Sequence, residues 1–252
     1  MKLLLLTVSS AVLAIGGAAI AADLPVKAPA YAAPLQDWTG IYVGGSAGGV
    51  LGYARDDWTA SPPAFPSSIA PTGSTTFKPA GFIGGGQVGY NSQASNVVWG
   101  VEADLNYTGL STSRLAPIPP PPANTVGGSV TSHLLATVRG RLGMTNGGML
   151  LYVTGGLAFA NVKFLDGTLF NTAAPFTNSS DSALAGWTVG AGAEWMINRN
   201  WSVKGEYLYV DLGKETNNGV TSGAVVLAPI SFDHRLTEHI GRVGLNFNFG
   251  PK

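Results

Sequence analysis

The chain has 252 residues, of which 45% are hydrophobic and only 11% are charged, and its mean hydropathy is +0.21. Lys and Arg number 14 and Asp and Glu also number 14, so no basic field attracts nucleic acid, and the lack of cysteine excludes disulfides, thiolate catalysis and zinc–thiolate sites. So few charges are unusual for a soluble enzyme, and we expect something other than water to cover part of the surface.

The amino-terminal segment is predicted to direct export. Residues 1–22 combine Lys2, an apolar run and small residues at Ala19 and Ala21, which is the layout of a cleaved bacterial signal peptide. Residues 23–37 are rich in proline and alanine without periodicity and predict an extended periplasmic linker. The ordered domain is expected over residues 38–252, and it has no apolar run long enough for a spanning helix.

Alternating hydrophobicity recurs along this domain. Residues 97–107 are typical: Trp99 and Tyr107 fall on one parity with other apolar residues, whereas Glu102 and Asp104 fall on the other. Eight such strands are predicted, at residues 38–53, 82–91, 97–107, 132–144, 149–164, 186–196, 201–212 and 238–249. The pattern alone fits either a soluble sandwich or a membrane barrel with its apolar face outward.

The connections favour the barrel. Three joins are short and polar, at residues 92–96, 145–148 and 197–200, and the pair Asn146-Gly147 carries a tight-turn pattern. The long joins are residues 54–80, 108–131, 165–185 and 213–237. Regular alternation predicts an all-β fold: an eight-stranded antiparallel transmembrane β-barrel with short periplasmic turns and long extracellular loops.

Aromatic residues recur at one even spacing. The expected aromatic girdle consists of Trp99, Tyr107, Trp187, Trp195, Trp201, Tyr209 and Phe249. At ~3.3 Å per residue the paired members lie roughly 26 Å apart along a strand, or about 20 Å once the strand is tilted, close to the ~25 Å apolar band of such barrels. These pairs are therefore predicted to mark the two membrane interfaces.

Charges on the opposite parity are predicted to form a network in the lumen. Its expected members are Glu102, Asp104, Arg139, Arg141, Glu194, Lys204, Glu206 and Arg242. The short turns place Glu194 across from about Lys204 and Gln87 across from about Glu102, with Arg139 on the next strand. Because an eight-stranded barrel is just wide enough for side chains to fill, paired charges that close the lumen are favoured over an open ion pathway.

Other motifs give little chemistry. Gly84, Gly86 and Gly89 have the spacing of a dinucleotide fingerprint, but a strand and not a helix is expected to follow. The three histidines, His133, His234 and His239, lack metal-ligand spacing, so no metal, cofactor or catalytic site is predicted.

Two loop motifs leave alternatives open. His234 beside Asp233 and Arg235 could form an acid–base site, although no second group supports it. The proline run at residues 118–122 fits a stiff loop better than a polyproline ligand for a partner.

Several segments together resemble a known family. They are ADLPVKAPAYAAP, DWTGIYVGGSAGG, GGGQVGYN, WGVEADL, WTVGAGAEW, WSVKGEYLYVDLG and RVGLNFNF. The chain resembles the small porin-like, eight-stranded outer-membrane proteins of alphaproteobacteria, which include major surface antigens. This resemblance implies a place in the outer membrane of a Gram-negative cell, with outer-membrane lipid, lipopolysaccharide and the barrel-assembly machinery as partners. Such barrels usually end on the terminal aromatic residue, whereas here Phe249 is followed by Gly250, Pro251 and Lys252.

The functional expectation is a monomeric surface protein with a structural, envelope-integrity or host-contact role, and not an enzyme. Two alternatives stay open: a narrow porin-like channel for small solutes, and binding of a host or surface ligand, such as haem or an adhesin target, through the outer loops.

Overall fold

A computed structural model describes residues 37–60, 72–118, 124–170, 174–221 and 228–249. All of them belong to one compact unit, Leu35–Lys252. The predicted signal peptide and nearly all of the predicted linker lie outside the described residues. Among the described residues no helix is long and apolar enough to cross a membrane.

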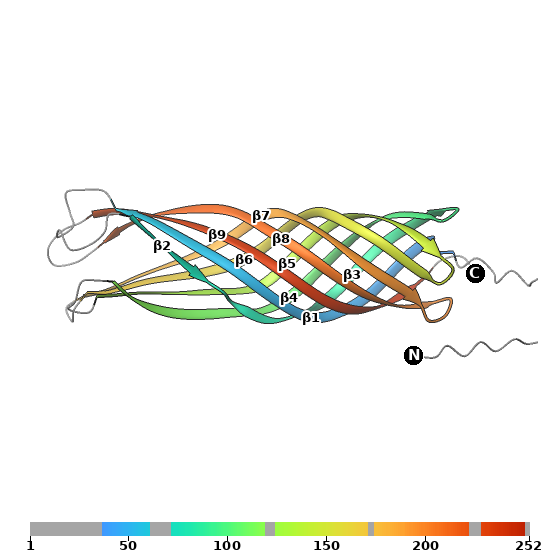
Figure 1. Ribbon diagram of the computed structural model, residues 1–252, viewed down its shortest axis with the longest axis horizontal. Helices are drawn as coiled ribbons and strands as arrows, with labels where there is room; N and C mark the ends of the chain where they lie inside the picture. The colour runs from blue at the N-terminus through green and yellow to red at the C-terminus, as the bar shows by residue number, and fades with distance from the viewer. Residues whose placement is uncertain (1–36, 61–71, 119–123, 171–173, 222–227, 250–252) are drawn as a thin grey trace, which may run out of the picture. The chain divides into compact units, whose positions relative to one another are not determined.

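The described residues form one closed antiparallel barrel (Figure 1). Its strands are β1 (Gly40–Ala60), β2 (Thr72–Phe77), β3 (Ala80–Ala94), β4 (Val97–Ile118), β5 (Asn124–Asn146), β6 (Met149–Phe170), β7 (Ala174–Met196), β8 (Trp201–Thr221) and β9 (Ala228–Asn248). β1 pairs with both β2 and β3, the strands from β3 to β9 pair in chain order, and β1 also pairs with β9 to close the sheet. The eight-stranded antiparallel barrel predicted from the sequence is confirmed.

One position in the barrel is shared by two strands. β2 pairs with the second half of β1 and β3 with the first half, so together they occupy a single place in the sheet. Lys78 and Pro79 separate them, because proline has no N–H to donate to the ladder. The carbonyl oxygen of Pro79 still accepts a hydrogen bond of 2.7 Å from the backbone N–H of Gly52.

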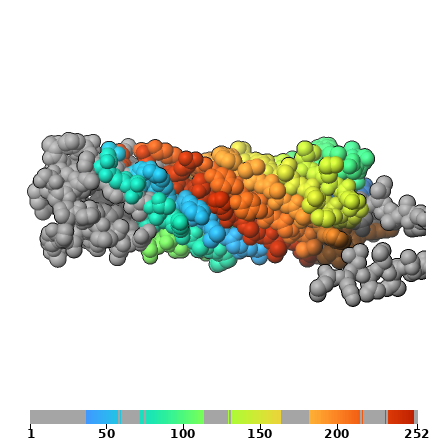
Figure 2. All heavy atoms as spheres, viewed as in Figure 1, coloured from blue at the N-terminus to red at the C-terminus, as the bar shows by residue number. Residues whose placement is uncertain are grey.

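Side chains alternate between the two faces of the sheet as the sequence predicts. In β4, Trp99 and Tyr107 are about half exposed on the outside, whereas Glu102 and Asp104 are buried inside. An exterior of valine, leucine and aromatic side chains suits hydrocarbon, and the closed sheet leaves no unpaired edge in it. In the space-filling view, side chains fill the gaps between the ribbons on the visible face (Figure 2).

The structure differs from the sequence in the segments predicted as long loops. The strands continue through most of them: β4 and β5 stay paired as far as Ile118 and Asn124, and β6 and β7 as far as Phe170 and Ala174. These segments are rich in Thr, Ser, Val and Gly, which remain extended once a partner strand satisfies their backbone groups. Long paired hairpins therefore stand beyond the aromatic positions.

The register shifts where the strands pass these positions. Irregularities occur at Tyr107/Leu110 in β4, at Ser132/Leu134 in β5 and at Asp211/Lys214 in β8. A bulge adds a residue on one strand and so reverses which parity faces inward. The inward parity changes in this way in β5, where Ser132 and Leu135 are both buried, whereas in β4 Leu110 stays buried on the same parity as Glu102 and Asp104.

The interior has three parts along the barrel axis. An apolar layer fills the half toward the long hairpins and consists of Val50, Ala54, Phe77, Ile83, Leu110, Leu135, Ala158, Ala160, Val162, Leu184, Leu208, Val210, Leu212, Leu236 and Ile240. A smaller apolar cluster near the short turns consists of Trp38, Val98, Leu150, Tyr152 and Met196. Charged side chains lie between the two.

Candidate functional site: the barrel interior

Eight charged side chains meet inside the barrel. This interior charge network contains the eight residues proposed from the sequence: Glu102, Asp104, Arg139, Arg141, Glu194, Lys204, Glu206 and Arg242. All are at most 6% exposed, and they come from β4, β5, β7, β8 and β9. With four acids and four bases, the network carries no formal net charge.

Arg139 lies at the centre of the network. Its guanidinium binds Glu102, Asp104 at 2.8 Å and Glu206 at 3.1 Å, while its Nε donates to the hydroxyl of Thr137 at 3.0 Å. One arginine thus joins three carboxylates from β4 and β8. Buried charges persist when they are paired and hydrogen-bonded in this way.

Two further bases complete the pairing of these acids. Arg242 contacts Glu206 at 2.6 Å and Asp104 at 3.1 Å, and the ammonium of Lys204 lies 2.9 and 3.0 Å from the two carboxylate oxygens of Glu102. The carboxylates therefore bridge neighbouring bases, and the network is continuous across the interior.

Arg141 extends the network toward the short turns. It binds Glu194 at 2.8 Å, and its guanidinium lies 4.0 Å from the ring centroid of Tyr152. It also donates to the hydroxyl of Tyr42 at 3.0 Å, and that hydroxyl donates to Glu102 at 2.7 Å. The two tyrosines were not predicted as members of the network, although both occupy the inward parity.

The predicted strand pairings are partly met. Glu194 pairs in register with Lys204, and Glu102 with Arg139. Gln87 pairs with Asp104 and not with Glu102, a difference of two residues that keeps its side chain inward. Its amide donates to Asn246 at 2.8 Å. The turn length therefore predicted the correct face but not the exact neighbour.

The apolar layer was not predicted. The inward parity was predicted to be polar, yet Leu208, Val210 and Leu212 are all buried in the interior. The available signal was that both parities become apolar toward the end of the seventh predicted strand, residues 201–212. Glu238 lies in this layer with no exposed surface, and neither carboxylate oxygen has a hydrogen-bond partner.

The histidines lie apart from one another. His133 faces outward, against the sequence parity, because the strand is irregular at Ser132/Leu134, and its ring stacks on Tyr107 at 5.7 Å. His234 is buried and contacts Asp56 at 2.7 Å. His239 is on the outside, 2.6 Å from the hydroxyl of Tyr207.

The two chemical motifs considered from the sequence do not form sites. Asp233 and Arg235 alternate with His234 along β9, so the histidine faces inward while its two neighbours occupy the outward parity. The glycines of the dinucleotide pattern lie within β3, which is followed by a turn and β4. Among the described residues no group of three or more His, Cys, Asp or Glu could hold a metal ion.

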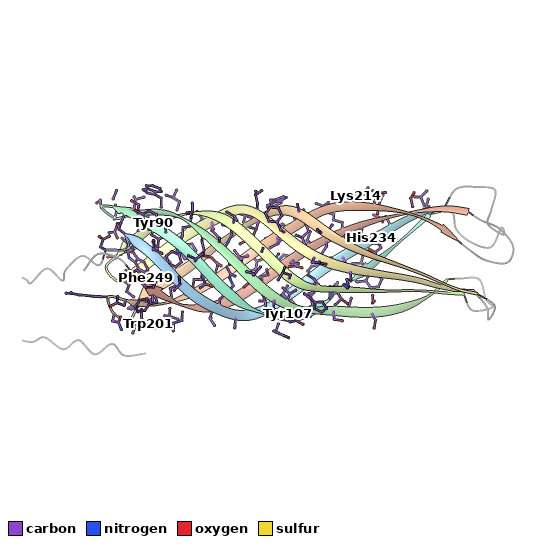
Figure 3. The ribbon with its side chains drawn as sticks, turned by 180° about the vertical axis from the view of Figure 1, so that it is seen from behind. Tyr90, Tyr107, Trp201, Lys214, His234 and Phe249 are labelled. Atoms are coloured by element: carbon purple, nitrogen blue, oxygen red, sulfur yellow. The ribbon has the colours of Figure 1, made fainter. Side chains whose placement is uncertain are left out.

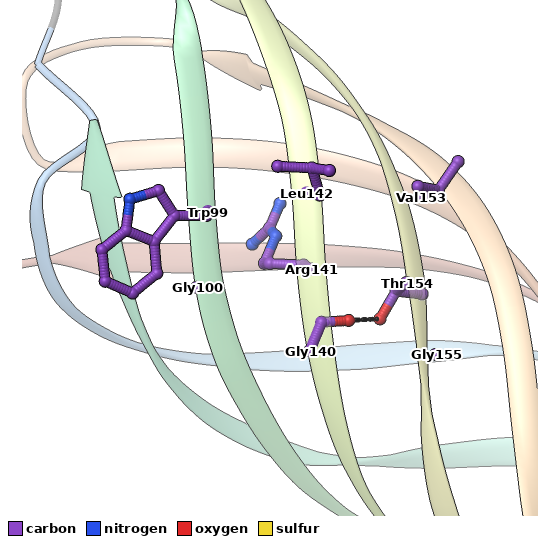
Figure 4. Close-up of a pocket in the computed structure, with 8 residues that line it drawn as sticks. All are labelled: Trp99, Gly100, Gly140, Arg141, Leu142, Val153, Thr154 and Gly155. Atoms are coloured by element: carbon purple, nitrogen blue, oxygen red, sulfur yellow. Dashed lines mark hydrogen bonds between the residues drawn. The ribbon is translucent and has the colours of Figure 1, made fainter. Parts of the chain in front are cut away.

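A shallow hollow of about 370 Å³ lies on the wall of β4, β5 and β6. Gly140 and Gly155 face each other there and leave a gap between Trp99, Leu142 and Val153 (Figure 4). Thr154 donates to the carbonyl of Gly140 at 2.8 Å, and Arg141 is bound to Glu194 in the interior. These polar groups are already used, so the hollow offers an apolar groove and no reactive centre.

The residues of the expected aromatic girdle lie on the outside. Trp99, Tyr107, Trp187, Trp195, Trp201 and Phe249 are each 40–59% exposed, and Tyr209 contacts Trp187 at 5.5 Å between ring centroids. In Figure 3, Trp201 and Phe249 lie near the short-turn end, whereas Tyr107 lies farther along the barrel. Paired hairpins continue beyond Tyr107.

Comparison with known proteins identifies the family. Residues 11–228 match the model of the outer membrane protein beta-barrel domain. The chain belongs to this family. It is 36% identical to the 31 kDa outer-membrane immunogenic protein of Brucella melitensis over 92% of this chain and 93% of that protein. It is 32% identical to a 22 kDa outer membrane protein of Rhizobium leguminosarum bv. viciae over 76% of this chain and 69% of that protein.

The protein is therefore an outer-membrane β-barrel of the alphaproteobacterial type that the sequence resembles. Among solved structures, the outer membrane protein OprG of Pseudomonas aeruginosa is similar, with a TM-score of 0.46 and 14% identity over 85% of this chain and 99% of that one.

Proposed function

We propose that this protein is a structural surface protein of the outer membrane whose lumen is closed, and that it has no enzymatic activity. The observation that carries the proposal is the interior charge network: Arg139 alone binds three carboxylates, and every acid of the network has a basic partner within 3.1 Å. An ion would have to break several of these buried contacts to pass.

The apolar layer supports the same function. It lies in series with the network along the barrel. Its residues are at most 9% exposed, and Leu110, Leu208 and Ile240 are no more than 1% exposed. Water and ions are disfavoured in such an enclosure. Two closures of different chemistry thus lie between the two ends of the barrel.

Single-channel recording in planar bilayers tests the closed lumen. The purified, folded barrel is expected to give no stable conductance steps, with a general porin as positive control. Stable steps that change when Arg139 is replaced by alanine would instead support the narrow solute channel.

The relatives named immunogenic proteins favour exposure at the cell surface. We infer that the long paired hairpins supply the exposed region in this chain as well, as rigid extensions of the wall. Antibodies raised against the hairpin segments are expected to label intact cells. Binding of haem or of an adhesin target has no specific support among the described residues.

A further inference from the structure

Three basic residues stand side by side on the outside of the barrel. Arg55 of β1 pairs in register with Arg235 of β9, and Arg235 pairs with Lys214 of β8. We call these three residues the basic row. Their side chains are 61–62% exposed. Like charges directly opposite each other destabilise a sheet, so a row of three cations needs an anion nearby.

Carboxylates of the protein satisfy the row only in part. Asp57 contacts Arg55 at 3.1 Å, Asp233 contacts Lys214 at 2.8 Å, and Asp211 contacts Arg235 at 2.8 Å. The carboxylate of Asp211 accepts a hydrogen bond from one terminal nitrogen of Arg235, and the carboxylate of Asp57 accepts hydrogen bonds only from Nε of Arg55. A guanidinium has five N–H donors, so several on each arginine remain directed at the exterior.

The position of the row relates it to the membrane. Arg55 follows Tyr53 by two residues on β1, which is about 7 Å along the strand. Tyr53 and Tyr209 contact His239 at 5.5 and 5.2 Å between ring centroids, and this aromatic group lies at the level of the outer girdle. In Figure 3, Lys214 lies farther than Tyr107 toward the long hairpins.

A fourth cation joins the same area. The ammonium of Lys78, between β2 and β3, lies 5.6 Å from the ring centroid of Tyr53, and its side chain is exposed. Four cations and three carboxylates therefore lie together in this area, and an aromatic surface adjoins them on the membrane side. This is the arrangement expected where lipid headgroups meet the barrel wall, with rings against the apolar part and cations at the phosphates.

We propose that the basic row, together with Lys78, binds the phosphate of a phosphorylated glycolipid headgroup in the outer leaflet, with Tyr53 and His239 beneath it. The site rests on the barrel spanning the outer membrane, but not on the lumen being closed. Arginine suits this ligand because its planar donors fit phosphate oxygens in pairs.

The binding test uses the whole chain without its predicted signal peptide, in non-ionic detergent. Native mass spectrometry measures its affinity for diphosphorylated lipid A, for the same lipid without phosphates, and for inorganic phosphate. The diphosphorylated lipid should bind most tightly, and inorganic phosphate should not displace it at equal concentration. Equal affinity for the dephosphorylated lipid would overturn the proposal, and displacement by inorganic phosphate would show a site for free anions instead.

Two sets of variants give opposite expected results. The double variant R55Q/K214Q removes two cations and should weaken binding of the diphosphorylated lipid by about five- to tenfold. The double variant D57N/D233N removes the nearby negative charge and should tighten binding. Weaker binding by D57N/D233N would overturn direct contact between the cations and the phosphate.

Arg199 supplies the matched control. It is exposed in the turn between β7 and β8, at the other end of the barrel, so R199Q removes a cation without touching the site. R199Q should bind within twofold of the wild type, and an equal loss would indicate attraction by net charge alone. Heat-modifiable migration on a gel confirms folding of each variant. Conductance of the wild type separately tests the closed lumen, so failure of either proposal leaves the other standing.

Discussion

Glu194 and Lys204 face each other on β7 and β8, yet the ammonium of Lys204 binds Glu102 on β4. Glu194 accepts hydrogen bonds from Arg141, from the hydroxyl of Ser202 at 2.6 Å and from the amide of Asn246 at 2.7 Å. Glu194 and Lys204 are thus neighbours in register but not charge partners, because the barrel brings β4 and β8 together across its interior. This cross-barrel pairing predicts how the network responds to mutation.

Lys204→Met should destabilise the barrel by about 3 kcal/mol, because it removes one partner of a buried ion pair and leaves the interior charge network with an excess of negative charge. Urea unfolding in lipid vesicles, followed by tryptophan fluorescence, measures the loss. The double variant Glu102→Gln/Lys204→Met should recover part of it. If Glu194→Gln restores more stability than Glu102→Gln in the Lys204→Met background, the cross-barrel pairing is wrong.

Tyr42→Phe should cost about 1–2 kcal/mol, because the Tyr42 hydroxyl both donates to Glu102 and accepts from Arg141 in a buried site. Tyr90→Phe is the matched control, since Tyr90 is 43% exposed on the outside of the neighbouring strand β3. The same unfolding measurement applies. Equal effects of the two substitutions would contradict the interior role of Tyr42.

Glu238→Leu should stabilise the barrel by about 1–3 kcal/mol, because Glu238 is a buried carboxyl group without a hydrogen-bond partner among apolar side chains. The urea midpoint should rise. Leu236→Ala is the control, and it should lower the free energy of unfolding by about 2–4 kcal/mol because of the cavity it leaves. A lower midpoint for Glu238→Leu would mean that this carboxyl has a stabilising role.

Asp233 should titrate below its usual range. Lys214 and Thr216 donate hydrogen bonds to its carboxylate outside the membrane, and this lowers the pKa of Asp233. Because the pKa is lower in the folded than in the unfolded state, the ion pair stabilises the folded protein above about pH 4. This stabilisation is lost as the pH falls through the folded-state pKa. Carboxyl NMR titration measures it. Lys214→Gln should raise the pKa toward about 3.9, and an unchanged value would exclude Lys214 as the cause.

Much of the wall was determined by the sequence alone. Strict alternation in residues 97–107 assigned Trp99 and Tyr107 to the outside and Glu102 and Asp104 to the inside, and the structure has them there. This succeeds because side chains on a strand alternate with period two, and a membrane barrel needs an apolar outer face wherever it contacts lipid. Short polar joins likewise identified the turns, since tight turns require particular residues.

The tertiary structure decided what lies beyond each strand pair. Which acid meets which base depends on the stagger of strands around the closed barrel, so the contact between Lys204 and Glu102 could not be inferred from either segment. The irregularity at Ser132/Leu134 turns His133 outward, and the pairing of β4 with β5 converts a predicted loop into a wall. The apolar layer and the basic row arise in the same way: each is assembled from residues far apart in the chain, and only closure of the sheet makes them neighbours.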